Sequence, residues 1–209
     1  HDAEATANGI QQDVHSAGKA TADLRNSGAI TVRSTAEAIG SGGGQYLGAG
    51  LYADAFADGL DQEVYARGDV NATISNAASI NVIAEAEANG FGYEEARAYA
   101  DAVGIEQELA AADYQDTRAV GSVVNSAAIT VKSVATVTLD DATTAYSAPY
   151  ASGFAAGIEQ YSYDFAFATL DVTNSGTIAV SAEVNALGRD ARAGDPQEAF
   201  EYHSVAIND

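Results

Sequence analysis

The chain has 209 residues, and its nine Lys and Arg against thirty Asp and Glu give a formal net charge of −21. This charge excludes nucleic acid as a partner, because phosphate binding needs a basic face, and it disfavours contact with an anionic membrane surface. The chain has no Cys, which excludes disulfides, thiolate zinc sites and Cys nucleophiles. No apolar run approaches the length of about eighteen residues that a spanning helix needs, so we expect no membrane insertion of this segment.

The first predicted element is a β-strand in which Ala occupies every second position before Gly9. The same tract precedes Gly59, Gly104 and Gly157, and eleven of the twelve positions two, four and six residues before these glycines are Ala. Ala by itself is a poor strand former, but a helix would not confine Ala to alternate positions between aromatic and charged residues. We therefore predict strands whose Ala side chains point into a narrow interior.

Each of these glycines opens a Gly-(Ile/Leu)-x-Gln motif, and the Gln has the same strand parity as the Ile or Leu. This parity predicts an inward ladder, formed by Gln12, Gln62, Gln107 and Gln160. The next predicted element is a turn followed by a strand, Asn26-Ser27-Gly28-Ala29-Ile30-Thr31-Val32, which returns at Asn76, Asn125 and Asn174 in steps of 50, 49 and 49 residues. These Asn side chains are expected to stack at the turn, each bonding the next coil.

Two motifs on one period predict an array of repeats, and the alternation with period two predicts strands. The expected fold is all-β, a parallel β-helix (β-solenoid) of four repeats of about 49–50 residues with an Ala-rich narrow interior. It forms a single array over residues 1–209, with units at approximately 1–50, 51–99, 100–148 and 149–209. Each unit has room for about four strands. Two coils of roughly 25 residues per unit is the favoured interpretation, and one broad coil is the alternative.

The segment Phe200 to Ile207 falls where the next copy of the Ala strand is expected. Ile207 lies 197 residues after Ile10, four repeats within a residue. Open solenoid ends expose backbone edges that normally need a cap. Two explanations remain: the chain is an excerpt of a longer array, or copies stack head to tail, with Phe200 and Tyr202 as a partial cap or a subunit joint.

The Asn-Ser-Gly-x-Ile-x-Val motif followed by an alternating Ala tract resembles the repetitive β-helical passenger or adhesin regions of bacterial autotransporters and haemagglutinin-like surface proteins. The resemblance covers essentially the whole chain, but its motifs are fold-level. It implies an exported protein, extracellular or on the bacterial cell surface, used as a stalk, in adhesion or in aggregation. It transfers no catalytic residue, since the same scaffold carries enzymes, adhesins and spacers.

The carboxylates are the candidates for catalysis, because polysaccharide lyases of this fold hold calcium with Asp clusters and use an Arg as base. The candidates are Asp54, Asp58, Asp61, Asp101, Glu106 and Glu159, with Arg67 or Arg97. Their spacing follows the repeat instead of converging on one coil, so we predict no enzyme activity, no catalytic residue and no cofactor. Weak Ca²⁺ binding between coils is the one exception, with Glu94, Glu95, Asp140 and Asp141 as candidate ligands.

Aromatic residues at outward parity beside the Ala strand form the candidate contact surface, which we expect to meet other cell-surface components or glycans. They are Tyr52, Phe56, Tyr99, Tyr150, Phe154, Tyr161 and Tyr163. The alternative is that these rings pair with one another from coil to coil. The sequence thus predicts a structural or adhesive protein, an extended stalk or a self-associating fibre stacked head to tail. The alternative is a glycan-binding or polysaccharide-degrading parallel β-helix protein.

Overall fold

The computed structural model describes residues 2–41, 50–91, 95–112, 117–140, 149–188, 192–193, 197–199 and 203–207. The described residues form β-strands joined by turns. The strands are β1 (Asp2–Ser16), β2 (Ala20–Asn26), β3 (Ile30–Ser41), β4 (Gly50–Ala66), β5 (Val70–Asn76), β6 (Ile80–Phe91), β7 (Glu95–Ala111), β8 (Arg118–Asn125), β9 (Ile129–Asp140), β10 (Tyr150–Tyr163), β11 (Phe167–Asn174), β12 (Ile178–Leu187), β13 (Arg192–Ala193), β14 (Gln197–Ala199) and β15 (His203–Ile207).

The strands form three sheets whose pairings are all parallel. Sheet A has the order β1-β4-β7-β10, with β13, β14 and β15 on the far edge of β10; sheet B is β11-β8-β5-β2 and sheet C is β12-β9-β6-β3. Each repeat thus supplies one strand to each sheet and stacks on its own equivalent. The predicted parallel β-helix is confirmed. The favoured interpretation of two coils per repeat is wrong: each repeat is one broad coil of three strands.

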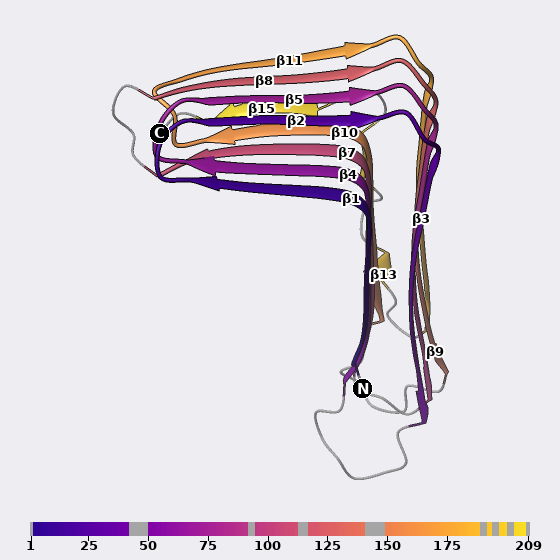
Figure 1. Ribbon diagram of the computed structural model, residues 1–209. Coiled ribbons are helices and arrows are strands. Elements are labelled where there is room, and N and C mark those ends of the chain that lie inside the picture. The colour runs from indigo at the N-terminus through magenta and orange to yellow at the C-terminus, as the bar shows by residue number, and fades with distance from the viewer. Residues whose placement is uncertain are drawn as a thin grey trace.

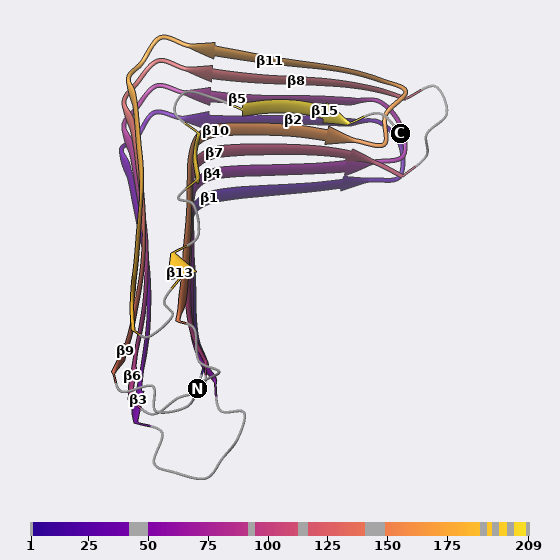
Figure 2. The same cartoon turned by 180° about the vertical axis from the view of Figure 1, so that it is seen from behind.

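The coil has an L-shaped outline, and sheet A lies along the inner side of both arms (Figures 1 and 2). Sheet B covers the outer side of one arm and sheet C covers the outer side of the other, so we call these the B arm and the C arm. At the Gly-(Ile/Leu)-x-Gln motif the chain bends inside one continuous strand. For example, β4 runs unbroken from Gly50 to Ala66 through Gly59.

The bend depends on a glycine because the opposite strand fills the angle. A Cβ on Gly104 would lie 2.5 Å from the carbonyl oxygen of Gly157 and 2.6 Å from Cγ2 of Ile129. Ile129 is the first residue of the strand that follows the Asn turn. The two repeating motifs therefore pack against each other across the corner, the Gly on the inner side and the Asn-turn strand on the outer side, which explains why they share one period.

The C arm has the narrow interior that the Ala pattern predicted. Ala53, Ala55, Ala98 and Ala100 are at most 1% exposed and pack with the small apolar residues of sheet C. Where sheet C carries a Ser, its hydroxyl bonds across the interior, as when Ser133 Oγ donates to the carbonyl of Ala100 at 2.8 Å. A small side chain at every second position lets the two sheets approach closely enough for such a bond.

Both predicted amide ladders are present. At the outer corner, each Asn donates to the next one along the array, from Asn26 through Asn76 and Asn125 to Asn174, with every N···O distance 2.7 Å. Inside the B arm the Gln ladder runs the other way: Gln62 donates to Gln12 and Gln107 to Gln62 at 2.7 Å, and Gln160 to Gln107 at 2.6 Å. Gln62, Gln107 and Gln160 are fully buried.

The last strands extend sheet A. β15 pairs with β10 so that Ser204 lies opposite Gln160 and Ile207 opposite Tyr163. The expectation that Ile207 continues the Ile10 column is therefore wrong, because in this register it lies several residues past Ile158. Phe200 and Tyr202 lie outside the described residues.

Candidate functional site

The solvent face of sheet A is the concave side of the L, and it is strongly acidic. β1, β4, β7 and β10 carry three, four, four and one Asp or Glu, and the only Lys or Arg on these strands is Arg97. Side chains that alternate with the inward Ala and Gln residues face this side. The bend turns the two halves of each strand toward each other, so acidic side chains on either side of the glycine approach one another.

One column at the bend holds three carboxylates in register. Asp61 of β4 lies opposite Glu106 of β7, which lies opposite Glu159 of β10. Neighbouring strands are about 4.8 Å apart, and like charges directly opposite one another are unfavourable. Asp58 approaches from the other side of the bend, since the charges of Asp61 and Glu159 act on it, and the charge of Asp101 acts on Asp58 as well. We call Asp58, Asp61, Asp101, Glu106 and Glu159 the acidic corner.

Burial and mutual repulsion raise the pKa values in the acidic corner. The pKa of Asp58 rises to about 7, first through burial and then through Asp61, Asp101 and Glu159. The pKa of Asp61 rises to about 6 through burial and the charges of Glu63, Asp13 and Glu108, although a hydrogen bond from Gln11 acts the other way. Burial, followed by the charges of Asp58, Asp61 and Glu159, raises the pKa of Glu106 to about 8.

Two carboxylate oxygens in the acidic corner are buried without a hydrogen-bond partner, Oδ1 of Asp61 and Oδ1 of Asp101. Asp61 as a whole is only 6% exposed. An unsatisfied buried carboxylate oxygen costs free energy, so its presence needs an explanation. Within the described part of the chain, no three Asp, Glu or His side chains are already arranged to hold a metal ion.

The structure thus brings together most of the carboxylates that the sequence analysis expected to stay apart. Asp54 lies elsewhere on the C arm, where burial and the charges of Glu4 and Asp2 raise its pKa. The two candidate bases are not in the acidic corner. Arg97 forms an ion pair with Glu95, and Arg67 lies past the end of β4, where its backbone N–H donates to the carbonyl of Ser16 at 3.2 Å.

Of the four predicted calcium ligands, only Glu95 has a described side chain. Glu95 accepts a hydrogen bond from Tyr52 Oη at 2.8 Å, and this bond is the main cause of its lowered pKa. Glu94, Asp141 and the side chain of Asp140 lie outside the described residues.

The predicted aromatic residues all face the concave side of sheet A, and most are half-buried; Tyr150 is 41% exposed. Some of the rings pair with each other. Phe56 and Tyr99 on neighbouring strands have centroids 5.7 Å apart, and Tyr161 stacks on Tyr163 at 6.2 Å. Ring pairing therefore coexists with a surface on which aromatic and carboxylate side chains are mixed.

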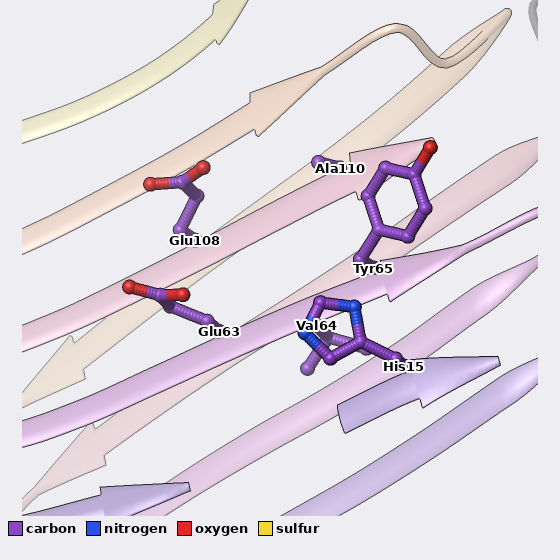
Figure 3. A pocket seen from close by; sticks show the side chains of 6 residues that line it. All are labelled: His15, Glu63, Val64, Tyr65, Glu108 and Ala110. Atoms are coloured by element: carbon purple, nitrogen blue, oxygen red, sulfur yellow. The ribbon is translucent and has the colours of Figure 1, made fainter. Parts of the chain in front are cut away.

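A small pocket of about 130 Å³ lies farther along the B arm, on the same face of sheet A. Figure 3 shows Glu63 and Glu108 side by side on neighbouring strands, with His15 and Tyr65 nearby. The rings of His15 and Tyr65 are 5.8 Å apart. Glu63 and Glu108 follow Asp61 and Glu106 by two residues, so the acidic face continues from the acidic corner into this pocket.

No protein-family model, curated protein or solved structure matches this chain. Among the described residues there is no helix that is long and apolar enough to cross a membrane. The acidic corner was missed as a site because sequence spacing along a straight strand hides the approach that the bend creates. One signal was available in the spacing of the inward residues. They lie two, four and six residues before each of the four glycines, but one and three residues after it.

Proposed function

We propose that this chain is a structural segment of an extended fibre or stalk, which grows by stacking a further copy of the chain on its open coil edges and has no enzymatic role. The observation that carries this proposal is the uniformity of the interior. The same Ala, Gln and Asn columns run through all four coils, and they define one axis along which coils add in register. Such an array gains stability mainly from contacts between neighbouring repeats.

The dimensions of the coil favour stacking. Four coils separated by about 4.8 Å rise only about 20 Å along the axis, whereas a 17-residue strand such as β4 has a contour of roughly 55 Å. A single chain is therefore broader than it is high. It becomes an extended object only when more coils are added along the axis.

Both ends of the described array offer strand edges to a second copy. β2 and β3 each pair on one side only, as do β11 and β12 at the other end. The direction of hydrogen-bond donation along the Gln ladder also suits stacking. Gln160 Oε1 is buried without a hydrogen-bond partner, and a Gln12 amide from the next copy would donate to it as each Gln does to the coil before. β15 occupies this edge of β10, so the incoming strand must replace it.

The Asn-turn and Ala motifs resemble those of autotransporter passenger and haemagglutinin-like adhesin regions. On the basis of this resemblance we propose that the protein is displayed outside the cell, on a bacterial surface, and acts in adhesion or aggregation. Its partners would be other copies of itself and cell-surface components.

The test is negative-stain electron microscopy of the purified chain at rising concentration. We expect filaments of uniform width that lengthen with concentration. The diagnostic variant is Gln12→Glu, which still accepts the bond from Gln62 but cannot donate to Gln160 of another copy and places a charge in the joint. The control is Thr21→Glu, which adds the same charge to an exposed position on the edge strand β2. Isolated particles about 20 Å thick at every concentration, or filaments unaffected by Gln12→Glu, would contradict the proposal.

A second candidate function is supported by the mixture of aromatic and carboxylate side chains on the concave face of sheet A. Such a face suits sugar rings, which stack on aromatics and donate hydroxyl hydrogen bonds to carboxylates. Binding to a glycan array that is lost in Phe56→Ala and Phe154→Ala, with the filaments intact, would favour a glycan-binding protein. Release of sugars from the bound glycan would favour polysaccharide degradation.

A further inference from the structure

The acidic corner is the feature of the molecule that its repeat architecture leaves unexplained. The Asn and Gln columns satisfy one another through hydrogen bonds from coil to coil. In their ionised form Asp61, Glu106 and Glu159 cannot do this, because ionised carboxylates are acceptors only. The charges that shift the pKa values of Asp58, Asp61 and Glu106 all belong to Asp and Glu side chains.

The burial of Asp61 places a carboxylate where its negative charge needs compensation. Asp61 is more than nine-tenths buried, its Oδ1 has no hydrogen-bond partner, and its neighbours in the corner are carboxylates. Oδ1 of Asp101 is buried and unpartnered as well. Burying like charges against one another is costly unless a cation or a proton compensates them.

We propose that the acidic corner binds a divalent cation of the calcium type between adjacent coils, with Asp61 and Glu106 as its principal ligands and Asp58 and Glu159 beside them. Calcium prefers carboxylate oxygens and accepts an irregular shell of six to eight ligands that includes water. Among the described residues no three carboxylates already form a group that could hold a metal ion, so binding requires side chains to rearrange. Asp61 and Glu106 are register partners on neighbouring strands, so a change of side-chain rotamer brings their oxygens to one ion.

The experiment is isothermal titration calorimetry with CaCl₂ at protein concentrations where sedimentation shows single chains. A Kd on the order of 10⁻⁴–10⁻³ M is expected. The test variant Asp61→Asn with Glu106→Gln should weaken binding by at least about tenfold, because the number of ligand charges sets the affinity. The matched control is Glu37→Gln with Glu87→Gln, since these two are also register partners but are exposed on sheet C. The control should bind within about twofold of wild type.

A further measurement on the wild-type protein keeps the test decisive if the corner variant folds poorly. Magnesium should bind more weakly, because it demands a regular octahedral shell. The absence of saturable binding up to about 10 mM calcium, which is well above the expected Kd, would overturn the proposal. So would equal affinities for the corner variant and the control. Because single chains are titrated, failure of the fibre proposal leaves this result unaffected.

Discussion

The corner glycines give the sharpest test of the fold, and Gly104→Ala is the variant of choice. The added Cβ would lie 2.5 Å from the carbonyl oxygen of Gly157 and 2.6 Å and 3.2 Å from methyl groups of Ile129 and Val131. One of these contacts is to backbone of the next coil, so the strain cannot be relieved by turning a side chain. Overpacking of this kind costs about 3 kcal/mol, at the upper part of the usual range.

A smaller effect opposes this cost. Replacing Gly by Ala reduces the freedom of the unfolded chain and stabilises the fold by about 0.5–1 kcal/mol where the native backbone permits. The net loss expected for Gly104→Ala is therefore about 2 kcal/mol. With a urea m-value of about 2–3 kcal/mol/M, the denaturation midpoint should fall by roughly 0.7–1 M.

Gly18→Ala is the matched control, because nothing lies within 4 Å of a Cβ at that position. There only the unfolded-state effect operates, so Gly18→Ala should leave the stability unchanged or raise it slightly. Urea unfolding followed by circular dichroism measures both variants. A Gly104→Ala protein as stable as Gly18→Ala would refute the reasoning that the bend requires a glycine.

Three further predictions concern the interior and the acidic corner. Gln107→Leu keeps the side-chain volume but leaves both neighbours in the Gln ladder with an unpaired buried amide. The free energy of unfolding measured by urea titration should therefore fall by about 2–5 kcal/mol. An unchanged denaturation midpoint would mean that the ladder contributes nothing. Ala100→Leu inserts a large side chain where the native Ala is fully buried, and the same assay should show a loss of about 2–3 kcal/mol or more. Stability should also depend on pH, because burial and repulsion raise the pKa values of Asp58, Asp61 and Glu106 to about 7, 6 and 8. The folded state then binds more protons than the unfolded state, so this contribution is fully present below about pH 4 and is lost as the pH rises through 6 to 8. Thermal melts from pH 4.5 to pH 8.5 check this, and Asp61→Asn with Glu106→Gln should flatten the profile.

Much of this fold could be predicted from particular residues. The Ala positions before each glycine, the small apolar positions after each Asn turn, and the Asn and Gln ladders are all where the pattern indicated. The reason is local: alternation along a strand separates the two faces, and a fixed repeat aligns each residue with its own equivalent in the next coil. Neither inference needs knowledge of how the strands turn in space.

What the tertiary structure decided is the course of the chain at the glycines. A strand ending at Gly59 and a strand continuing through it give the same spacing of Ala and Gln, so the sequence alone left one coil and two coils both open. Packing resolves this, because the strand that follows each Asn turn occupies the angle beside the glycine and leaves space only for a bend. That bend turns Asp58 and Asp61 toward the same concave corner. The sequence by itself thus determined the faces of the strands and their register, whereas only the folded coil brought the carboxylates together, since their approach depends on the direction of the chain and not on its periodicity.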